Sequence, residues 1–297
     1  RMVVKKMNRR KLAMNSVLML LVLALSLNSP QIVRVQGAPE VPYGPYPDEL
    51  IIFLQAAEAT VIPKIEAGEM QAWLWWLNIE NTRIAEASPK VDLVNAYGLF
   101  NELLINPLVT TGGFNPFSIR EVREALNWLI DRDYITNDLW YGRGRPKWTI
   151  FKTISPDYAR VADYMKQLEG KYAYDFARAK VQVFTALEEA GAVLREGKWY
   201  YGAAPITVKV LIRIEDERKQ TGDYVASQLE KLGFTVEKLY KRSRDAYLLW
   251  GALAPSLRGE WHIYTAGWIS TAMVAYEDDL PWFMYSEDNA PLFGVYQ

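Results

Sequence analysis

The chain of 297 residues contains no cysteine and only one histidine, His262. Without cysteine there are no disulfides, no thiol nucleophile and no cysteine to which a lipid anchor is attached. A single histidine, placed inside a predicted strand, excludes multi-histidine metal sites and disfavours a Ser-His-Asp triad. His262 is better interpreted as a histidine with satisfied hydrogen bonds or as a surface residue.

The chain also lacks an excess of positive charge, with 34 Lys and Arg against 35 Asp and Glu. Residues 1–37 hold seven basic and no acidic side chains, which leaves 27 basic against 35 acidic residues, a charge of −8, in the remainder. Such a surface does not suit nucleic-acid binding, because phosphates are neutralised by Lys and Arg. The short basic run at residues 143–147 is interpreted as a solvated loop. We therefore expect no nucleic-acid partner.

The beginning of the sequence has the pattern of a secretory signal peptide. Five basic residues between Lys5 and Lys11 precede an apolar run at 17–25, and small residues surround positions 37–38. A transmembrane anchor is the alternative, but the apolar run is short for a bilayer. We expect residues 1–37 to be the signal peptide and residues 38–48 to be a proline-containing linker. The mature protein is then secreted or at the cell surface, on the outer face of the cytoplasmic membrane or in a periplasm.

The most informative segment is FNPFSIREVREALNWLIDRDYI, residues 114–135. Its apolar residues recur at helical spacing, which predicts an amphipathic helix. Ser118 is the predicted N-cap, with Glu121 as its reciprocal capping partner. Four further motifs stand in a defined order and spacing along the chain: GEM at 68–70, YDFARAK at 174–180, LGFTV at 232–236 and GW at 267–268.

Together, these motifs resemble the family 5 solute-binding proteins of ABC importers, the peptide- and nickel-binding class. The resemblance runs from about Gly44 to about Trp268, and an archaeal-type member is expected. It implies an α/β fold of the type II periplasmic-binding-protein class, in which two lobes joined by crossing strands close on a ligand. Family members are commonly longer than 297 residues, so the resemblance also implies a fragment.

Residues 206–266 predict a parallel sheet, because strands at 206–212, 235–240 and 261–265 alternate with helices at 216–232 and 244–253. Further elements are expected in two groups: strands at 50–54, 71–77, 91–97 and 100–105, and helices at 56–67, 155–169 and 175–190. The expected domains are part of a first lobe at 49–106, a nearly complete second α/β lobe at 107–261, and a truncated crossing strand and return to the first lobe at 262–297.

The candidate ligand-binding residues follow from where ligands lie in such sheets, beyond the carboxyl ends of the strands. Gly267 and Trp268 are predicted to follow the last strand. Tryptophans at strand ends offer flat stacking faces. The predicted ligand-binding residues are Trp268, Trp76, Tyr97, Gly267 and Thr271. The acidic runs at 215–217 and 277–279 are interpreted as a helix start and a solvated turn, so no metal and no cofactor are expected.

The resemblance implies a non-enzymatic receptor that captures a solute, with an oligopeptide as the first expectation and an oligosaccharide as the alternative. Its partners are then the permease subunits of an ABC transporter, and a monomer is expected. In peptide-binding members an Asp shortly after the Gly-Trp pair holds the peptide amine, but here residues 269–272 contain no acid. The rival hypothesis is a secreted glycoside hydrolase using Glu69 and Glu260. The third hypothesis is a cell-surface structural module that binds no ligand.

Overall fold

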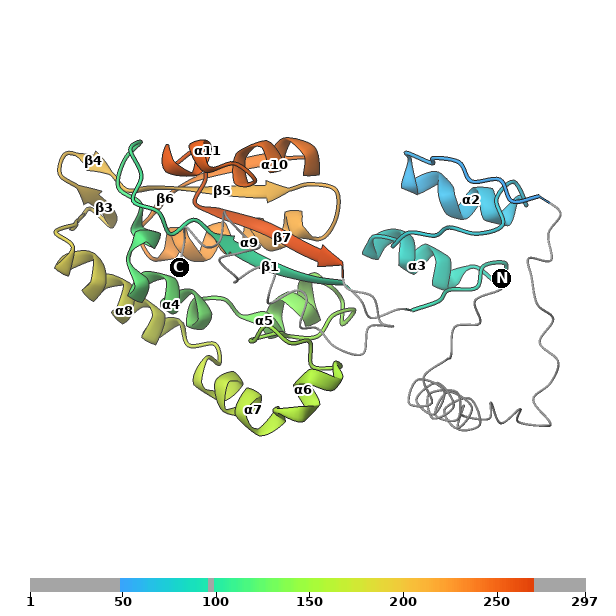
Figure 1. Cartoon of the computed structure of the whole chain (residues 1–297), viewed down its shortest axis with the longest axis horizontal. Coiled ribbons are helices and arrows are strands. Elements are labelled where there is room, and N and C mark those ends of the chain that lie inside the picture. The colour runs from blue at the N-terminus through green and yellow to red at the C-terminus, as the bar shows by residue number, and fades with distance from the viewer. Residues whose placement is uncertain (1–48, 96–98, 270–297) are drawn as a thin grey trace, which may run out of the picture. The chain divides into compact units, whose positions relative to one another are not determined.

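A computed structural model describes residues 49–95 and 99–269 (Figure 1). The predicted signal peptide and linker lie outside the described residues. Among the helices of these two segments, none has the length and hydropathy that a bilayer span requires.

The segment 99–269 is built on a four-stranded sheet with the strand order β1-β7-β5-β6. The strands are β1 (Leu99–Ile105), β5 (Thr207–Arg213), β6 (Thr235–Lys241) and β7 (Ile263–Ile269). β5 is parallel to both β6 and β7, which confirms the parallel sheet expected from the alternation of elements. β1 is antiparallel to β7 and forms one edge of the sheet.

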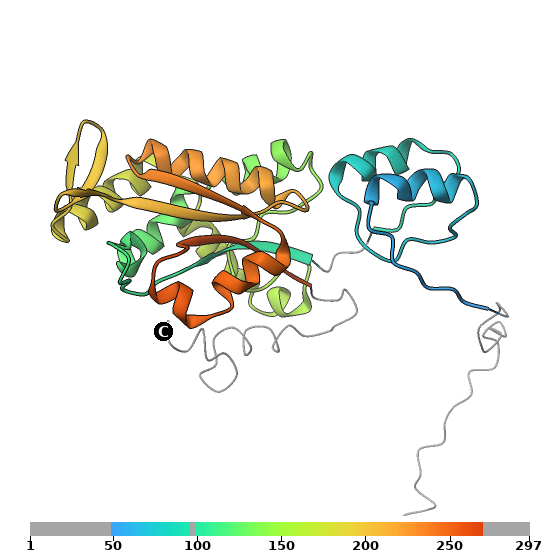
Figure 2. The ribbon, with the colours of Figure 1, turned by 90° about the horizontal axis from the view of Figure 1, so that it is seen from above.

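Helices cover both faces of this sheet, and β5 is accordingly a central strand with Val208, Val210, Leu211 and Ile212 all fully buried. On one face α9 (Arg218–Lys231) packs with α4 (Arg120–Leu129) and α8 (Phe176–Glu189) in the larger core. On the other face lie α10 (Ser243–Trp250) and α11 (Leu253–Leu257). Figure 2 shows α9 and the α10–α11 pair on opposite sides of the strands.

Smaller elements complete this segment. Between α4 and α8 the chain forms α5 (Arg132–Tyr134), the π-helix η3 (Ile135–Leu139), α6 (Pro156–Arg160) and α7 (Ala162–Lys171). A three-stranded antiparallel sheet follows α8 and contains β2 (Val193–Arg195), β3 (Lys198–Tyr201) and β4 (Ala204–Pro205). The helix expected at 155–169 is thus interrupted, because Val161 leaves helical geometry with φ −126° and ψ 26°.

The helix of the signature segment forms, but the predicted cap is wrong. A short 3₁₀ turn, η2 (Pro116–Ser118), precedes α4, so Ser118 lies inside this turn and its Oγ donates to the Asn115 carbonyl at 2.8 Å. Asn115 caps the turn instead, since its Oδ1 accepts the Phe117 N–H at 3.0 Å. In contrast, the cap of α8 is as expected: Asp175 accepts the Arg178 N–H, and Gly191 follows the helix at φ +86°.

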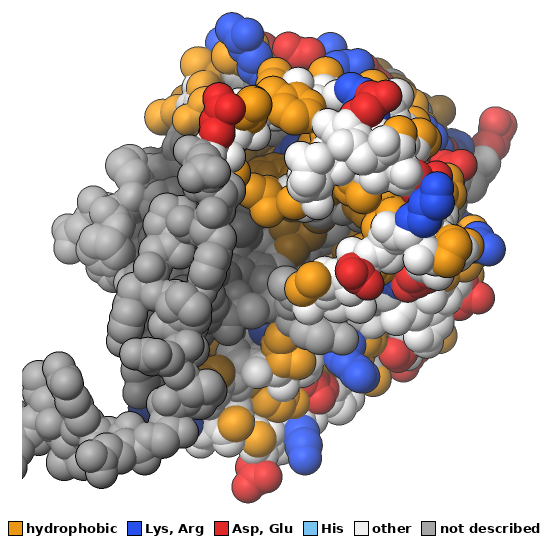
Figure 3. Space-filling view, turned by 90° about the vertical axis from the view of Figure 1, so that its right-hand side faces the viewer, with side chains coloured by type: hydrophobic (Ala, Val, Ile, Leu, Met, Phe, Trp, Pro, Cys, Tyr) orange, Lys and Arg blue, Asp and Glu red, His pale blue; other side chains and the backbone are white. Residues whose placement is uncertain are grey.

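The segment 49–95 contains the 3₁₀ turn η1 (Glu58–Thr60), α2 (Val61–Glu66) and α3 (Ile79–Ala87). The strands predicted at 50–54 and 71–77, and in the described residues of 91–97, are wrong. These stretches have no partner strand among the described residues, so their apolar side chains stay exposed, as at Leu54, Leu74 and Val94. Hydrophobic side chains are also exposed among charged ones on the face in Figure 3.

Candidate ligand-binding site

The carboxyl end of β7 projects past its parallel neighbour. The register places Val210 beside Ile263 and Leu211 beside Tyr264, and β5 ends at Arg213, so the last residues of β7 extend beyond β5. Gly267 and Trp268 were expected to follow the strand, whereas they belong to it, because β1 continues to pair with this end of β7. The edge is still the one at which α/β sheets bind ligands.

Gly267 allows two polar side chains to approach the β7 backbone closely. A β-carbon at this position would lie 2.5 Å from Arg218 Nη1 and 2.5 Å from Asn101 Oδ1. Asn101 is the Cα partner of Gly267 across the β1–β7 ladder, and Arg218 begins α9. The absence of a side chain at position 267 is therefore a requirement of this packing.

Arg218 forms a buried ion pair with Asp216 in the β5–α9 connection. Its Nε lies 2.7 Å from Asp216 Oδ1, its Nη2 contacts Oδ2, and the two side chains are 3% and 7% exposed. Asp216 Oδ1 also accepts the Arg218 N–H, which places the carboxylate at the amino end of α9 as predicted for the acidic run. Asp216 thus balances the charge of Arg218 and holds its guanidinium beside Gly267, at the end of β7.

Trp268 is half-buried and its indole N–H is already engaged. Nε1 donates to Glu102 Oε1 at 2.5 Å. Burial raises the pKa of Glu102 above its usual value, and the Trp268 hydrogen bond and the nearby charge of Lys147 oppose this rise. The Lys147 ammonium lies 4.0 Å from the ring centroid of Phe100, the Cα partner of Trp268.

Trp268 belongs to an aromatic cluster on the α10 face of the sheet. We define this cluster as Tyr247, Trp250, Tyr264 and Trp268. Trp250 stacks on Tyr264 with ring centroids 5.6 Å apart, and it makes T-shaped contacts with Tyr247 and Trp268 at centroid distances of 5.2 and 6.2 Å. Tyr247 is 57% exposed, so the cluster leads from solvent to the strand end. Such rings suit apolar side chains or sugar faces.

The other predicted site residues are Trp76, Tyr97 and Thr271. Trp76 belongs to the segment 49–95, where its ring stacks on Trp75 at 4.2 Å and its carbonyl accepts the Trp73 indole N–H. Tyr97 and Thr271 lie outside the described residues. The sequence did not point to Glu102, Trp250 or Tyr247, because these contacts depend on tertiary packing, and Glu102 is 166 positions from Trp268.

Of the two carboxylates considered for a hydrolase, Glu69 belongs to the segment 49–95 and Glu260 to the segment 99–269. Glu260 precedes β7, at the amino end of that strand and opposite to Trp268, and its carboxylate pairs with Arg258 Nε at 2.5 Å. No group of three acidic or histidine side chains gathers for a metal ion within 49–95 and 99–269. His262 is buried and accepts the Lys209 N–H through Nδ1 at 2.9 Å, as expected of a satisfied histidine.

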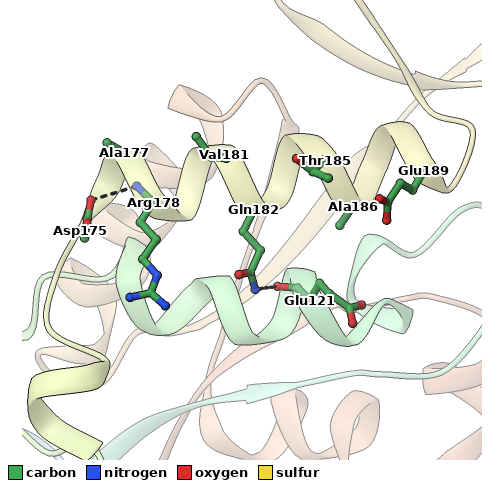
Figure 4. Close-up of a pocket in the computed structure, with 9 residues that line it drawn as sticks. All are labelled: Glu121, Asp175, Ala177, Arg178, Val181, Gln182, Thr185, Ala186 and Glu189. Atoms are coloured by element: carbon green, nitrogen blue, oxygen red, sulfur yellow. Dashed lines mark hydrogen bonds between the residues drawn. The ribbon is translucent and has the colours of Figure 1, made fainter.

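A groove also runs along the surface of α4 and α8 (Figure 4). Its polar side chains make local contacts: Asp175 caps α8, and Gln182 donates to the Glu121 carbonyl at 2.8 Å. The Arg178 guanidinium lies 3.9 Å from the Trp128 ring. None of the predicted ligand-binding residues lines this groove, and its contacts hold the two helices together.

Three solved structures illustrate the fold that this chain shares. DppA of Helicobacter pylori, in complex with the peptide STSA, is 20% identical, with 76% of this chain and 38% of that chain covered and a TM-score of 0.55. A mannohexaose-bound oligopeptide-binding protein of Thermotoga maritima is 18% identical, with 78% and 42% covered and a TM-score of 0.56. NikZ of Campylobacter jejuni, with Ni(L-His), is 15% identical, with 80% and 43% covered and a TM-score of 0.55.

These similarities confirm the type II periplasmic-binding-protein fold, of which this chain spans about two fifths of the length of each solved relative. A comparison with curated proteins found no match. Residues 33–290, most of the chain, match the family described as bacterial extracellular solute-binding proteins, family 5 Middle. The chain therefore belongs to the family 5 extracellular solute-binding proteins, as its motifs indicated.

Proposed function

We propose that this protein is a non-enzymatic receptor that captures a solute for an ABC importer. Family membership supports a binding role. The observation that carries the proposal is the position of Trp268, held by Glu102 at the strand end that projects past β5. Gly267 and the aromatic cluster border the same position.

An oligopeptide is the proposed ligand. The H. pylori relative is described in complex with a peptide, and apolar peptide side chains suit the aromatic cluster. An oligosaccharide is the second candidate, because the T. maritima relative is bound to mannohexaose and sugar rings stack on tryptophan. Tyr97, Thr271 and Trp76 remain proposed ligand contacts.

The wider setting is proposed from the same family relationship. The partners are the permease subunits of an ABC transporter, the receptor is a monomer, and it is located outside the cytoplasmic membrane after removal of residues 1–37. The proposed lobes are 49–106 and 107–261, with 262–297 returning to the first lobe. The antiparallel pairing of β1 with β7 supports a crossing at these strands.

A thermal-shift screen of the purified protein against peptide and oligosaccharide libraries tests the proposal, since a ligand that binds the folded state raises the unfolding temperature. Calorimetry on a hit should then show that Trp268→Ala loses about 1–3 kcal/mol of binding free energy. Tyr164→Ala, which truncates an exposed aromatic on α7, is the matched control and should bind normally. Release of products from the hit would contradict a receptor and favour a hydrolase.

A further inference from the structure

The basic loop, defined as residues 140–148, begins on the α9 face of the sheet. The Trp140 side chain packs against the larger core, and its indole N–H donates to Thr221 Oγ1 at 3.2 Å, in the first turn of α9. A β-carbon on Gly144 would lie 2.8 Å from the Trp140 ring, so the loop backbone lies close to the indole. Since α9 begins beside Gly267, this part of the loop is near the carboxyl end of β7.

The other end of the loop lies on the opposite face of the sheet. The Lys147 ammonium is 4.0 Å from the ring centroid of Phe100. Phe100 and Leu104 lie on the α10 side of β1, since side chains alternate along a strand, and Phe100 is the Cα partner of Trp268. The loop therefore passes from one face to the other at the edge where α/β sheets bind ligands. It is not the solvated loop that its charges suggested.

Arg132 joins this end of the loop to the helix α4. Its Nε donates to the Lys147 carbonyl at 3.0 Å, and its Nη1 and Nη2 donate to the Asn127 carbonyl and Oδ1 at 2.9 and 3.0 Å. The Asn127 carbonyl lies in the last turn of α4. In a continued helix the Asp131 N–H would bind it, but this N–H donates to the Tyr224 hydroxyl instead. The guanidinium thus supplies the donor that this helix end lacks.

The geometry of the guanidinium explains why an arginine stands at position 132. The acceptors of its three hydrogen bonds are all neutral, and no carboxylate forms an ion pair with it within the described parts of the chain. Burial lowers the pKa of Arg132 to about 10, because a buried charge is unfavourable. A guanidinium holds its donors in a rigid planar fork, whereas a lysine ammonium is a single point charge. The fork can therefore bind the helix end and the loop at the same time.

We propose that Arg132 is a positioning residue that holds the basic loop across the carboxyl end of β7, where the loop forms one side of the ligand-binding site. The proposal rests on the proposed function, because the site is the ligand-binding edge of the same sheet. It adds residues 140–148 to that site and requires no contact between Arg132 and the ligand. It also does not depend on whether Trp268 touches the ligand.

Limited proteolysis tests the first half without any ligand, because trypsin can cleave the loop after Arg143 and Lys147. The cleavage rate of a folded protein follows the fraction of molecules in which the loop is open. Arg132→Leu removes the hydrogen bonds of a charged donor and should speed loop cleavage about tenfold or more. Arg132→Lys keeps the charge without the fork and should be cleaved nearly as fast. Arg120→Leu, which changes an exposed arginine at the start of α4, is the matched control and should equal the wild type.

Mass spectrometry identifies the loop fragments, and thermal unfolding shows which variants fold. If Arg132→Leu does not fold, Asn127→Ala takes its place, because it removes only the acceptor of Nη2. Loop cleavage at the wild-type rate in the folded variant overturns the positioning role. A wild-type rate in Arg132→Lys overturns the geometric account, because charge alone would then hold the loop.

Protection by a bound probe tests the second half. The probes are mannohexaose and the peptide STSA, neither of which contains a trypsin site. At about ten times its Kd, the probe that binds should slow cleavage after Lys147 about tenfold. Cleavage after Arg195 in β2 should not change. The small sheet of β2 lies at the amino end of β5, opposite to the proposed site, since the Ile206 N–H donates to the Trp199 carbonyl.

The outcomes separate this proposal from the proposed function. Equal protection after Lys147 and Arg195, or protection at neither position, overturns the place of the loop in the site. If neither probe binds the wild type, the proposed function fails for these probes. The proteolysis of the unliganded variants then decides alone whether Arg132 holds the loop.

Discussion

Arg218 Nη1 lies 2.5 Å from the point at which a β-carbon of residue 267 would stand, and Asn101 Oδ1 lies at the same distance from that point. The Arg218 side chain is held in place by Asp216, and Asn101 is the Cα partner of Gly267 in the β1–β7 ladder. The strand end that presents Trp268 is therefore closely packed immediately before the proposed ligand contact.

Gly267→Ala should lower the free energy of unfolding by about 1–3 kcal/mol, because the added methyl group must displace Arg218 or Asn101. Urea denaturation measures the change. Gly170→Ala is the matched control: this position in α7 has open space around it, and alanine in a helix is favoured by about 0.5–1 kcal/mol. An unaltered unfolding midpoint for Gly267→Ala would show that the two neighbours move aside without cost.

Asp216→Asn should destabilise the protein by about 3 kcal/mol or more, because it leaves the buried Arg218 charge without its counter-ion. Glu260→Gln removes the carboxylate of an ion pair in which the Arg258 and Glu260 side chains are 55% and 37% exposed, and should cost less than about 1 kcal/mol. Both values come from urea denaturation at neutral pH. If the two variants lose similar amounts of unfolding free energy, burial does not determine how much the Asp216–Arg218 ion pair stabilises the protein.

The stability of the protein should fall as the pH falls from about 6.5 towards 4. Burial, with a smaller contribution from Lys209, lowers the pKa of His262 from 6.5 to about 4. In this range the unfolded chain binds the proton and the folded one does not, so the stabilisation is complete above 6.5 and lost as the pH approaches 4. The difference corresponds to about 3 kcal/mol.

Because His262 is the only histidine, a single variant isolates this effect. His262→Asn keeps an acceptor for the Lys209 N–H but does not titrate. Its unfolding free energy should vary less between pH 6.5 and 4.5 than that of the wild type. Parallel pH profiles for the two proteins would assign the acid sensitivity to carboxyl groups instead.

Trp261→Ala should cost about 3–5 kcal/mol of stability, since Trp261 is fully buried and its indole donates to Ser256 Oγ at 3.0 Å. Trp268→Ala should cost clearly less, because Trp268 is only half-buried. Thermal unfolding of the two variants without ligand gives the comparison. If Trp268→Ala is the more damaging change, Trp268 belongs to the core and its ligand-binding role is wrong.

Local patterns predicted the regular elements of the segment 99–269 well. The apolar spacing of 120–129 and the Asp175 and Gly191 signals act within one helix, and α4 and α8 form accordingly. The alternation of strands and helices from β5 to β7 predicted their parallel order, because such connections leave few topologies. The cap of α4 was misassigned because Ser118 belongs to the preceding turn η2, where its Oγ donates to the Asn115 carbonyl, and Ile119 at the start of α4 has no capping side chain.

The sequence by itself thus determined the family, the parallel sheet and the candidate position of Gly267 and Trp268 at its carboxyl end. Only the tertiary structure decided that the apolar runs 50–54 and 71–77 are not strands, since strands need a neighbour with which to pair. It alone also decided that Glu102 takes the Trp268 N–H and that Arg218 and Asn101 meet at Gly267. Periodicity and capping act over a few residues, whereas these contacts join positions that are distant in the chain and become neighbours only when β1, β7 and α9 pack together.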